Sequence, residues 1–253
     1  MESGLRGSIM DDRDSIQPAA LGIMCKAPQP GMTKTRLAEV IGSEQAASLA
    51  ACFLRDVATV VEAVPEDIGR RCYGVYAPKS AEAALKAILP ASFGLVLQDD
   101  ADFGVVLSSA VRHLLEAGHG CVVLINADSP TLPAQLLTEA ITALRKPGDR
   151  VVLGPTIDGG YYLIGLKAPH PSLFDDIPWS TSDVYRLTVA RARAIGLPVA
   201  ALPVWYDVDD AETLAWLQDE VAGRPLPFAE PGLIGGPAAV TRTYLAGLQS
   251  ALR

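Results

Sequence analysis

Short apolar runs alternate along the chain with longer segments whose apolar residues recur at helical spacing. Such runs are typical of β-strands, whereas apolar positions repeating every three or four residues predict amphipathic helices. The runs that predict strands lie at 20–25, 71–77, 94–98, 121–126 and 150–155. The helical patterns between them lie at 43–64, 80–89, 104–118 and 133–146. This alternation predicts an α/β fold of three layers, α/β/α and Rossmann-like, with a mostly parallel central sheet.

Some of these elements carry further signals. The run 121–126 is apolar throughout, which predicts a strand buried on both faces of the sheet. We expect Ser43 to be the N-cap of the helix over 43–64, and Pro65 follows the end of that helix.

The regular alternation of strand and helix patterns changes after residue 160. We expect further strands at 161–166 and 198–203, and helices at 180–196, 210–221 and 238–253. The proline- and glycine-rich segment 222–237 predicts a loop. The polar, aperiodic residues 1–19 predict a disordered tail. We therefore expect one domain over 20–221, with the loop and C-terminal helix of 222–253 packed on it.

Composition narrows the function classes. The net charge of −8 argues against nucleic acid as a partner, because phosphate backbones need a basic face. No run approaches the length of a membrane span, and residues 1–20 lack the apolar centre of a signal peptide. The four cysteines are scattered and mostly lie in apolar runs, which favours small buried hydrophobes over a metal site or disulfides and fits the cytoplasm. They are Cys25, Cys52, Cys72 and Cys121.

Basic residues follow the first predicted strand. Lys34 and Thr35 suggest a phosphate loop, but the glycines of a P-loop are missing, and Gly31 alone does not make a Rossmann turn. Lys26, Lys34 and Arg36 remain, on a loop stiffened by prolines, and such cations suit a diphosphate. The alternative is a solvated basic turn that begins a helix.

Carboxylates follow later strands. Asp128, after the run 121–126, suits a Mg²⁺ or Mn²⁺ ion that bridges a diphosphate, although Asp-Ser-Pro is also an ordinary turn. Asp207, Asp209 and Asp210 precede a predicted helix, where one is expected to cap the helix and another to bind metal; Asp209 is the candidate, and the choice among the three is left open. In parallel sheets ligands bind at the carboxyl ends of strands, so these side chains are expected at one edge.

A third carboxylate lies in a glycine turn. Asp158 is followed by Gly159 and Gly160, whose conformational freedom would let a substrate approach the backbone. Tyr161 and Tyr162 are expected to point to opposite faces. The alternative is a simple hairpin turn, which Asp-Gly also favours.

Taken together, these stretches resemble the bacterial DUF2064 family, some of whose members are described as arsenosugar-type or radical-SAM/selenodomain-associated glycosyltransferases, within the GT-A nucleotide-diphospho-sugar transferase superfamily. The resemblance covers roughly residues 20–218. The segments that carry it are KAPQPGMTKTRLA (26–38), NADSPTLP (126–133), LGPTIDGGYYLIGL (153–166), IPWSTSDVYRLT (177–188) and YDVDDAETL (206–214).

The resemblance implies a GT-A domain over 20–221, a nucleotide-sugar donor, a small acceptor and a divalent cation, Mg²⁺ or Mn²⁺. By that analogy Lys26, Lys34 and Arg36 contact the donor phosphates, and Asp128 holds the metal. The residues implied on the acceptor side are Asp158, Trp179, Ser180 and Thr181. This chain departs from the family at Asn126, where a small residue is usual, and in segment 98–107, which lacks the family's arginine.

The sequence therefore predicts a metal-dependent glycosyltransferase in which Asp158 is the candidate general base. Gly31, Gly159 and Gly160 complete the predicted substrate-binding set. Two alternatives stay open. One is a nucleotidyltransferase of guanylyl or cytidylyl type that releases pyrophosphate from a nucleoside triphosphate. The other is a nucleotide-binding regulator without catalysis. Oligomeric state, donor and acceptor are left open.

Overall fold

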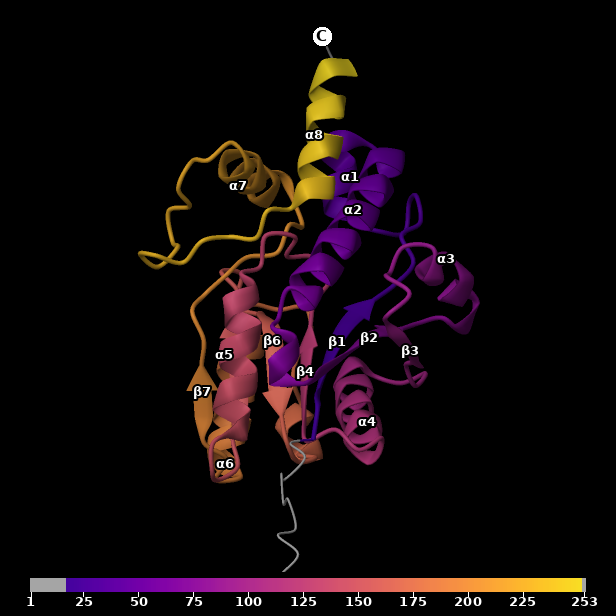
Figure 1. The fold of residues 1–253 in the computed structure, drawn as a ribbon. Coiled ribbons are helices and arrows are strands. Elements are labelled where there is room, and N and C mark those ends of the chain that lie inside the picture. Colours follow the sequence, from indigo (N-terminus) through magenta and orange to yellow (C-terminus); the bar gives the residue numbers. More distant parts are fainter. Residues whose placement is uncertain (1–16, 252–253) are drawn as a thin grey trace, which may run out of the picture.

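The computed structural model describes residues 17–251 and shows a single seven-stranded sheet between two layers of helices (Figure 1). The strand order is β3-β2-β1-β4-β6-β5-β7. Only β6 runs against its neighbours, because it pairs antiparallel with both β4 and β5. The predicted α/β/α fold with a mostly parallel sheet is confirmed. The predicted tail at 1–19 lies largely outside the described residues, although β1 begins at Ala19. The strands are β1 Ala19–Cys25, β2 Arg70–Tyr76, β3 Gly94–Leu97, β4 Cys121–Ile125, β5 Val151–Pro155, β6 Tyr161–Leu166 and β7 Val199–Ala201.

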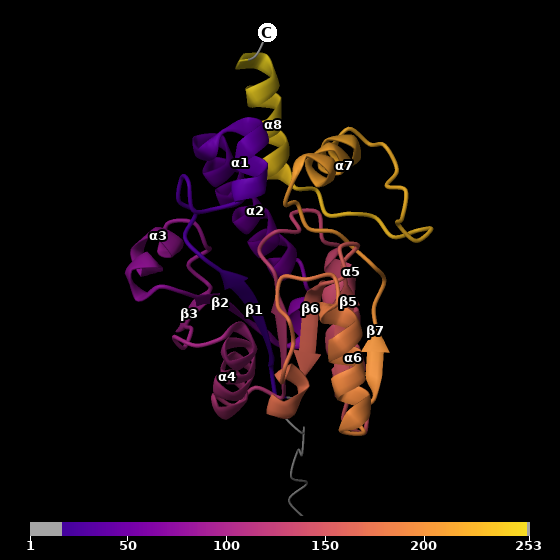
Figure 2. The same cartoon turned by 180° about the vertical axis from the view of Figure 1, so that it is seen from behind.

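Helices cover both faces of the sheet. One hydrophobic cluster joins α2 and α5 to one face, and a second cluster joins α4 and α6 to the other (Figures 1 and 2). β4 is fully buried, as its apolar run predicts. The α-helices are α1 Thr35–Ile41, α2 Ser43–Glu62, α3 Glu82–Lys86, α4 Phe103–Glu116, α5 Ala134–Arg145, α6 Val184–Ala194, α7 Ala211–Val221 and α8 Ala239–Ala251. Short 3₁₀ turns lie at Glu66–Ile68, Lys79–Ala81 and Pro171–Phe174.

Three helix predictions need correction. Ser43 is the first residue of α2 rather than its N-cap, because Gly42 adopts a positive φ of 88° and turns the chain between α1 and α2. The helix predicted over 180–196 begins only at Val184, since Ser180 has a φ of 65° that a helix does not accept. The helix predicted over 80–89 is a 3₁₀ turn followed by the five-residue α3.

The C-terminal segment returns to the domain. α8 packs on α2, and the buried carboxylate of Asp56 accepts hydrogen bonds from the amides of Val240 (3.0 Å) and Thr241 (2.8 Å) in the first turn of α8. An aspartate at that position satisfies amides that have no partner within the helix and complements its dipole. None of the helices in the described chain is long and apolar enough to cross a membrane.

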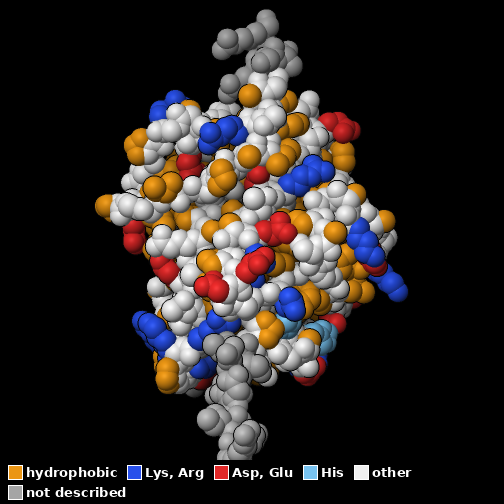
Figure 3. Space-filling view, in the orientation of Figure 1, with side chains coloured by type: hydrophobic (Ala, Val, Ile, Leu, Met, Phe, Trp, Pro, Cys, Tyr) orange, Lys and Arg blue, Asp and Glu red, His pale blue; other side chains and the backbone are white. Residues whose placement is uncertain are grey.

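The four cysteines are buried and free, as the sequence predicts. The face drawn in Figure 3 intersperses acidic and basic side chains and carries no continuous basic patch over the described residues. That mixed surface agrees with the acidic net charge.

Candidate functional site

The loop after β1 is held in shape by its own hydrogen bonds. The amides of Met32 and Thr33 both donate to the carbonyl of Gln29 at 3.1 Å, and the Thr33 hydroxyl accepts from the Gln29 amide at 2.9 Å. Gly31 takes a φ of 77°, which the tight turn requires. The loop leads directly into α1, so the helix start that was the alternative interpretation of this loop is present.

Lys34 occupies the N-cap position of α1 in the left-handed region, with φ 52° and ψ 52°. A residue other than glycine rarely takes this conformation, and such strain persists only where surrounding contacts fix it. The conformation directs the Lys34 side chain into the edge of the sheet, where it is only 6% exposed. The strained backbone of Lys34 is therefore found together with a buried position of its ammonium group.

That ammonium group joins the two aspartates predicted to bind metal. Lys34 Nζ lies 2.9 Å from Asp128 Oδ1 and 2.5 Å from Asp209 Oδ1. Arg36 Nη2 lies 2.7 Å from the other Asp209 oxygen. Burial by itself would lower the pKa of Lys34, but the two carboxylates outweigh burial and raise the pKa above its ordinary value. Residues from three distant segments thus form one charged cluster, consisting of Lys34, Arg36, Asp128 and Asp209, which we call the lysine–aspartate cluster.

Asp207 belongs to the same electrostatic environment, although the sequence did not single it out as a ligand. Burial, together with the carboxylates of Asp209, Asp158 and Asp128, raises its pKa to about 7 against the opposing effect of Lys34. The carboxyl edge therefore carries more negative charge than its cations neutralise. The motif DVDD and its position after a predicted strand were the only signals that sequence could offer for Asp207.

Asp210 has a structural role. Its side chain accepts from the Thr213 amide at 3.0 Å, and the Thr213 hydroxyl in turn accepts from the Asp210 amide at 3.1 Å, which forms a capping box at the start of α7. Of the three aspartates that precede α7, Asp210 is thus the helix cap, and Asp209 is the partner of Lys34.

Asp158 lies in the turn between β5 and β6, which pair antiparallel, so the hairpin alternative is correct for the backbone. Asp158 Oδ1 accepts from the Thr156 hydroxyl at 2.5 Å and from the Gly160 amide at 3.0 Å. At Gly159, with a φ of 92°, a Cβ would collide with the Ser182 carbonyl. One carboxylate oxygen of Asp158 is therefore used by the turn.

The two tyrosines after this turn point to opposite faces, as expected. Tyr162 is fully buried and donates from its hydroxyl to the Pro203 carbonyl at 2.9 Å. Tyr161 lies beside Trp179, whose ring meets Tyr161 and Phe103 edge to face at centroid distances of 6.5 and 5.0 Å.

The predicted site residues fall into two groups. Lys34, Arg36, Asp128 and Asp209 form one group through their salt bridges, whereas Trp179 belongs to the aromatic group with Tyr161 and Phe103. Ser180 and Thr181 form a tight turn before α6, in which the Thr181 hydroxyl donates to the Pro178 carbonyl at 2.8 Å. Within the described chain Lys26 is exposed and has no salt bridge.

The lysine–aspartate cluster has the donors that a hard divalent cation prefers. Asp128 and Asp209 both place a carboxylate oxygen beside one positively charged atom, Lys34 Nζ. Carboxylate oxygens are the ligands that a hard divalent cation takes. No group of three acidic, histidine or cysteine side chains is arranged around a common centre in the described residues. Mg²⁺ is commonly held by only one or two carboxylates together with substrate phosphates, so this pair fits such a cation if the Lys34 ammonium moves aside.

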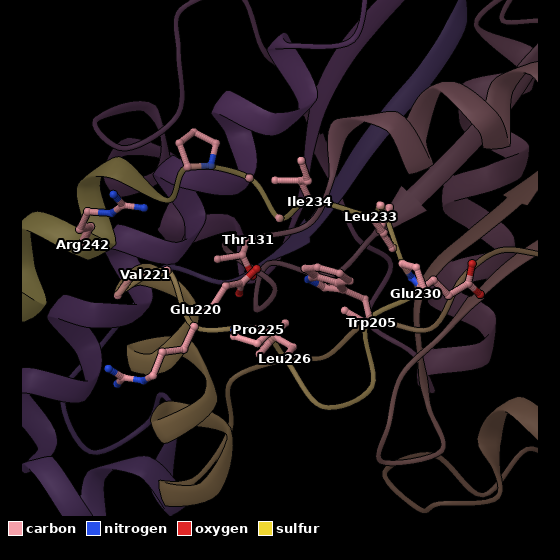
Figure 4. Close-up of a pocket in the computed structure, with 18 residues that line it drawn as sticks. Thr131, Trp205, Glu220, Val221, Pro225, Leu226, Glu230, Leu233, Ile234 and Arg242 are labelled. Carbon is pink, nitrogen blue, oxygen red and sulfur yellow. The ribbon is translucent and has the colours of Figure 1, made fainter.

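A well-defined cavity lies elsewhere. It measures about 530 Å³ and is lined by the end of α7, segment 223–237 and the start of α8 (Figure 4). None of the predicted site residues lines it.

Comparison with known proteins agrees with the predicted family. The family model "Uncharacterized protein conserved in bacteria (DUF2064)" matches residues 60–181. A solved structure from Desulfovibrio desulfuricans G20, described as a candidate nucleotide-diphospho-sugar transferase, is 29% identical with a TM-score of 0.78. The alignment covers 93% of this chain and 96% of that one. No curated protein matches the sequence.

Two more distant structures share the fold alone. CMP:2-keto-3-deoxy-manno-octonic acid synthetase complexed with CTP is 11% identical with a TM-score of 0.54, covering 81% of this chain and 99% of that one. 4-Diphosphocytidyl-2C-methyl-D-erythritol synthase from Anaerococcus prevotii DSM 20548 is 14% identical with a TM-score of 0.52, covering 80% and 96%. The fold is thus that of nucleotidyl and nucleotide-sugar transferases. The resemblance inferred from the sequence is confirmed to this extent: residues 60–181 match the DUF2064 family model, and the fold is GT-A-like, of the nucleotide-diphospho-sugar transferase type.

Proposed function

We propose that this chain transfers a sugar from a nucleotide-diphosphate donor to a small acceptor with the help of a divalent cation. One observation carries the proposal: Lys34, Arg36, Asp128 and Asp209 meet at the carboxyl edge of a sheet of this fold. Ligands bind at that edge in open α/β sheets. The similarity to the 29%-identical Desulfovibrio protein supports the choice of a nucleotide-sugar donor.

The chain's own residues would bind and orient the donor. Lys34 and Arg36 place two cations beside the site for the diphosphate, and exposed Lys26 adds a third from the same loop. Asp128 and Asp209 would hold the cation. A bound divalent ion would neutralise the negative charge that develops on the departing nucleoside diphosphate.

Asp158 remains the candidate for accepting the proton of the acceptor hydroxyl. Its Oδ1 is fixed by Thr156 and Gly160, which leaves Oδ2 for the acceptor. The exposed position of Asp158 beside the Gly159–Gly160 turn supports an acceptor that approaches from solvent. This arrangement requires donor and acceptor to meet between the lysine–aspartate cluster and the turn.

Nucleotidyl transfer is the second candidate. The same cations and carboxylates would serve a nucleoside triphosphate equally well, because both donors present a diphosphate unit. The third candidate is a regulator that binds nucleotides without converting them.

Product analysis separates these three. The protein is incubated with Mn²⁺ and a panel of nucleotide sugars or nucleoside triphosphates; donors that raise the melting temperature are then followed for products. A nucleoside diphosphate released from a sugar donor supports glycosyl transfer. Pyrophosphate released from a triphosphate supports the nucleotidyltransferase and overturns the proposal. Stabilisation without any product favours the regulator, and Asp128→Asn serves as the inactive control in each case.

A further inference from the structure

The cavity of about 530 Å³ is large enough for a small molecule and lies outside the candidate catalytic site. Segment 223–237 forms its outer wall by arching from the end of α7 to the start of α8 (Figures 1 and 4). Thr131 and Trp205 form its floor, and the segment is tied to that floor by the Gly236 amide, which donates to the Thr131 carbonyl at 2.7 Å.

One acidic side chain in this cavity is unusually placed. Glu220 lies half-buried in the last turn of α7, and burial raises its pKa. The C-terminal end of a helix is the end where a negative charge is disfavoured. No lysine, arginine or histidine of the described chain forms an ion pair with Glu220, although Arg224 and Arg242 also line the cavity. Arg224 is paired instead with Asp219.

The surroundings nevertheless hold this carboxylate in place. The Tyr206 hydroxyl donates to Glu220 Oε2 at 2.6 Å and itself accepts from the Thr131 hydroxyl at 3.3 Å. At Gly235 a Cβ would collide with Glu220 Oε1, so the segment passes over the carboxylate at a glycine. A half-buried acid that is oriented by two hydroxyls and lacks a cation is costly unless a ligand compensates it.

Apart from Arg224, Glu230 and Arg242, the side chains that line the rest of the cavity are mostly apolar. The ring of Trp205 forms part of the floor, and Figure 4 shows it between Leu226 and Leu233. An aromatic ring beside a carboxylate favours a positively charged group, and the leucines favour an apolar body. An anion would be repelled by Glu220.

We propose that the cavity between α7 and segment 223–237 is a second ligand site, which binds a protonated amine with an apolar body through Glu220 and Trp205. The site shares no residue with the lysine–aspartate cluster, so the test of this second site does not depend on the proposed transferase activity.

Three probes of the same shape test the proposal: phenethylamine, 2-phenylethanol and 3-phenylpropanoate. The chain has three tryptophans, so its ¹H–¹⁵N spectrum has three indole N–H signals, and Trp205→Phe assigns the relevant one. We expect phenethylamine to shift the Trp205 signal saturably and to bind about tenfold more tightly than the alcohol, with no binding of the acid. Equal binding of amine and alcohol, or no saturable shift with the amine, would overturn the proposal.

Variants test the role of Glu220. Glu220→Gln keeps the shape and an acceptor for Tyr206, and should weaken the amine about tenfold while leaving the alcohol unchanged. Glu212→Gln changes an exposed glutamate in the first turn of the same helix and should leave both affinities unaltered. Unchanged amine affinity in a folded Glu220→Gln protein also contradicts the proposal. If that variant fails to fold, the probe series on the unaltered protein decides.

Discussion

Lys34, on the loop after β1, reaches Asp128, on the loop after β4, with 2.9 Å between Nζ and Oδ1. The same ammonium group also neutralises Asp209, so a metal ion that uses these two carboxylates competes with a residue of the protein itself. In the proposed function this competition would link phosphate binding to metal binding, because a phosphate can accept the ammonium group that the metal displaces.

Replacing Lys34 by methionine should therefore have opposite effects on metal and nucleotide. Without the cation, Asp128 and Asp209 repel each other, and the affinity for Mn²⁺ in the absence of nucleotide should rise by at least about tenfold. Affinity for a nucleoside diphosphate should fall. Titration of Mn²⁺ followed by electron paramagnetic resonance measures the first effect and calorimetry the second. Lys79→Met removes an exposed lysine of the same charge and should change neither. Lower Mn²⁺ affinity in Lys34→Met would contradict the competition.

Asp128→Asn tests the metal assignment directly. The change keeps the shape of the side chain but removes half of the carboxylate pair, so Mn²⁺-dependent donor binding should be abolished while the melting temperature in chelator changes little. The donor-induced thermal shift with and without Mn²⁺ is the measurement. The exposed Asp100→Asn is the matched control. Donor binding that still depends on Mn²⁺ in Asp128→Asn would remove Asp128 from the metal site.

Arg36→Ala tests the phosphate role of the loop. Arg36 is exposed, and among the described residues its salt bridge is to Asp209 Oδ2, so its loss should leave the fold intact. We expect nucleoside diphosphates to bind about tenfold more weakly and nucleosides to bind as before, because only the diphosphate offers an anionic partner. Arg193→Ala, which removes an exposed arginine from α6, should affect neither. Equal losses for nucleoside and diphosphate would argue against the assignment.

Much of the fold follows from local patterns, whereas the arrangement of the site does not. The apolar run of β4 predicts its burial, and the position of Asp128 after that run predicts its place at the carboxyl edge. The contact between Lys34 and Asp209 depends on a left-handed lysine, a conformation that sequence propensity disfavours.

Prediction from local sequence also fails where a property depends on several residues that are distant in the chain. The raised pKa of Asp207 arises from burial and from carboxylates on three different loops, so no local motif reveals it. The role of Glu220 is likewise invisible in the sequence, where it reads as one more polar residue of α7. Its cavity appears only when segment 223–237 folds back across the helix end.

Asp56 should be a major source of stability for the C-terminal segment. Its carboxylate is 3% exposed and binds two amides of α8, so Asp56→Ala leaves both amides without a partner in a buried place. We expect a loss of about 2–3 kcal/mol in the free energy of unfolding and faster hydrogen exchange in α8. Urea denaturation and hydrogen exchange measure these effects. Asp67→Ala, at an exposed aspartate, should cost little, and a similar loss in both variants would show that the cap is unimportant.

The pKa of Glu220 predicts a pH dependence of stability. Because burial raises this pKa in the folded state above its ordinary value of 4.5, the folded protein retains the Glu220 proton at pH values where the unfolded chain has lost it. The unfolded state then binds fewer protons, so the free energy of unfolding must fall as pH rises from 4.5 through the folded-state pKa. Below pH 4.5 both states are protonated, and the contribution is constant. Glu220→Gln cannot ionise and should remove this part of the slope, whereas Glu212→Gln should retain it. Urea unfolding between pH 4 and about 8 measures the slope, and parallel curves for Glu220→Gln and the unaltered protein would show that Glu220 titrates as it does in the unfolded chain.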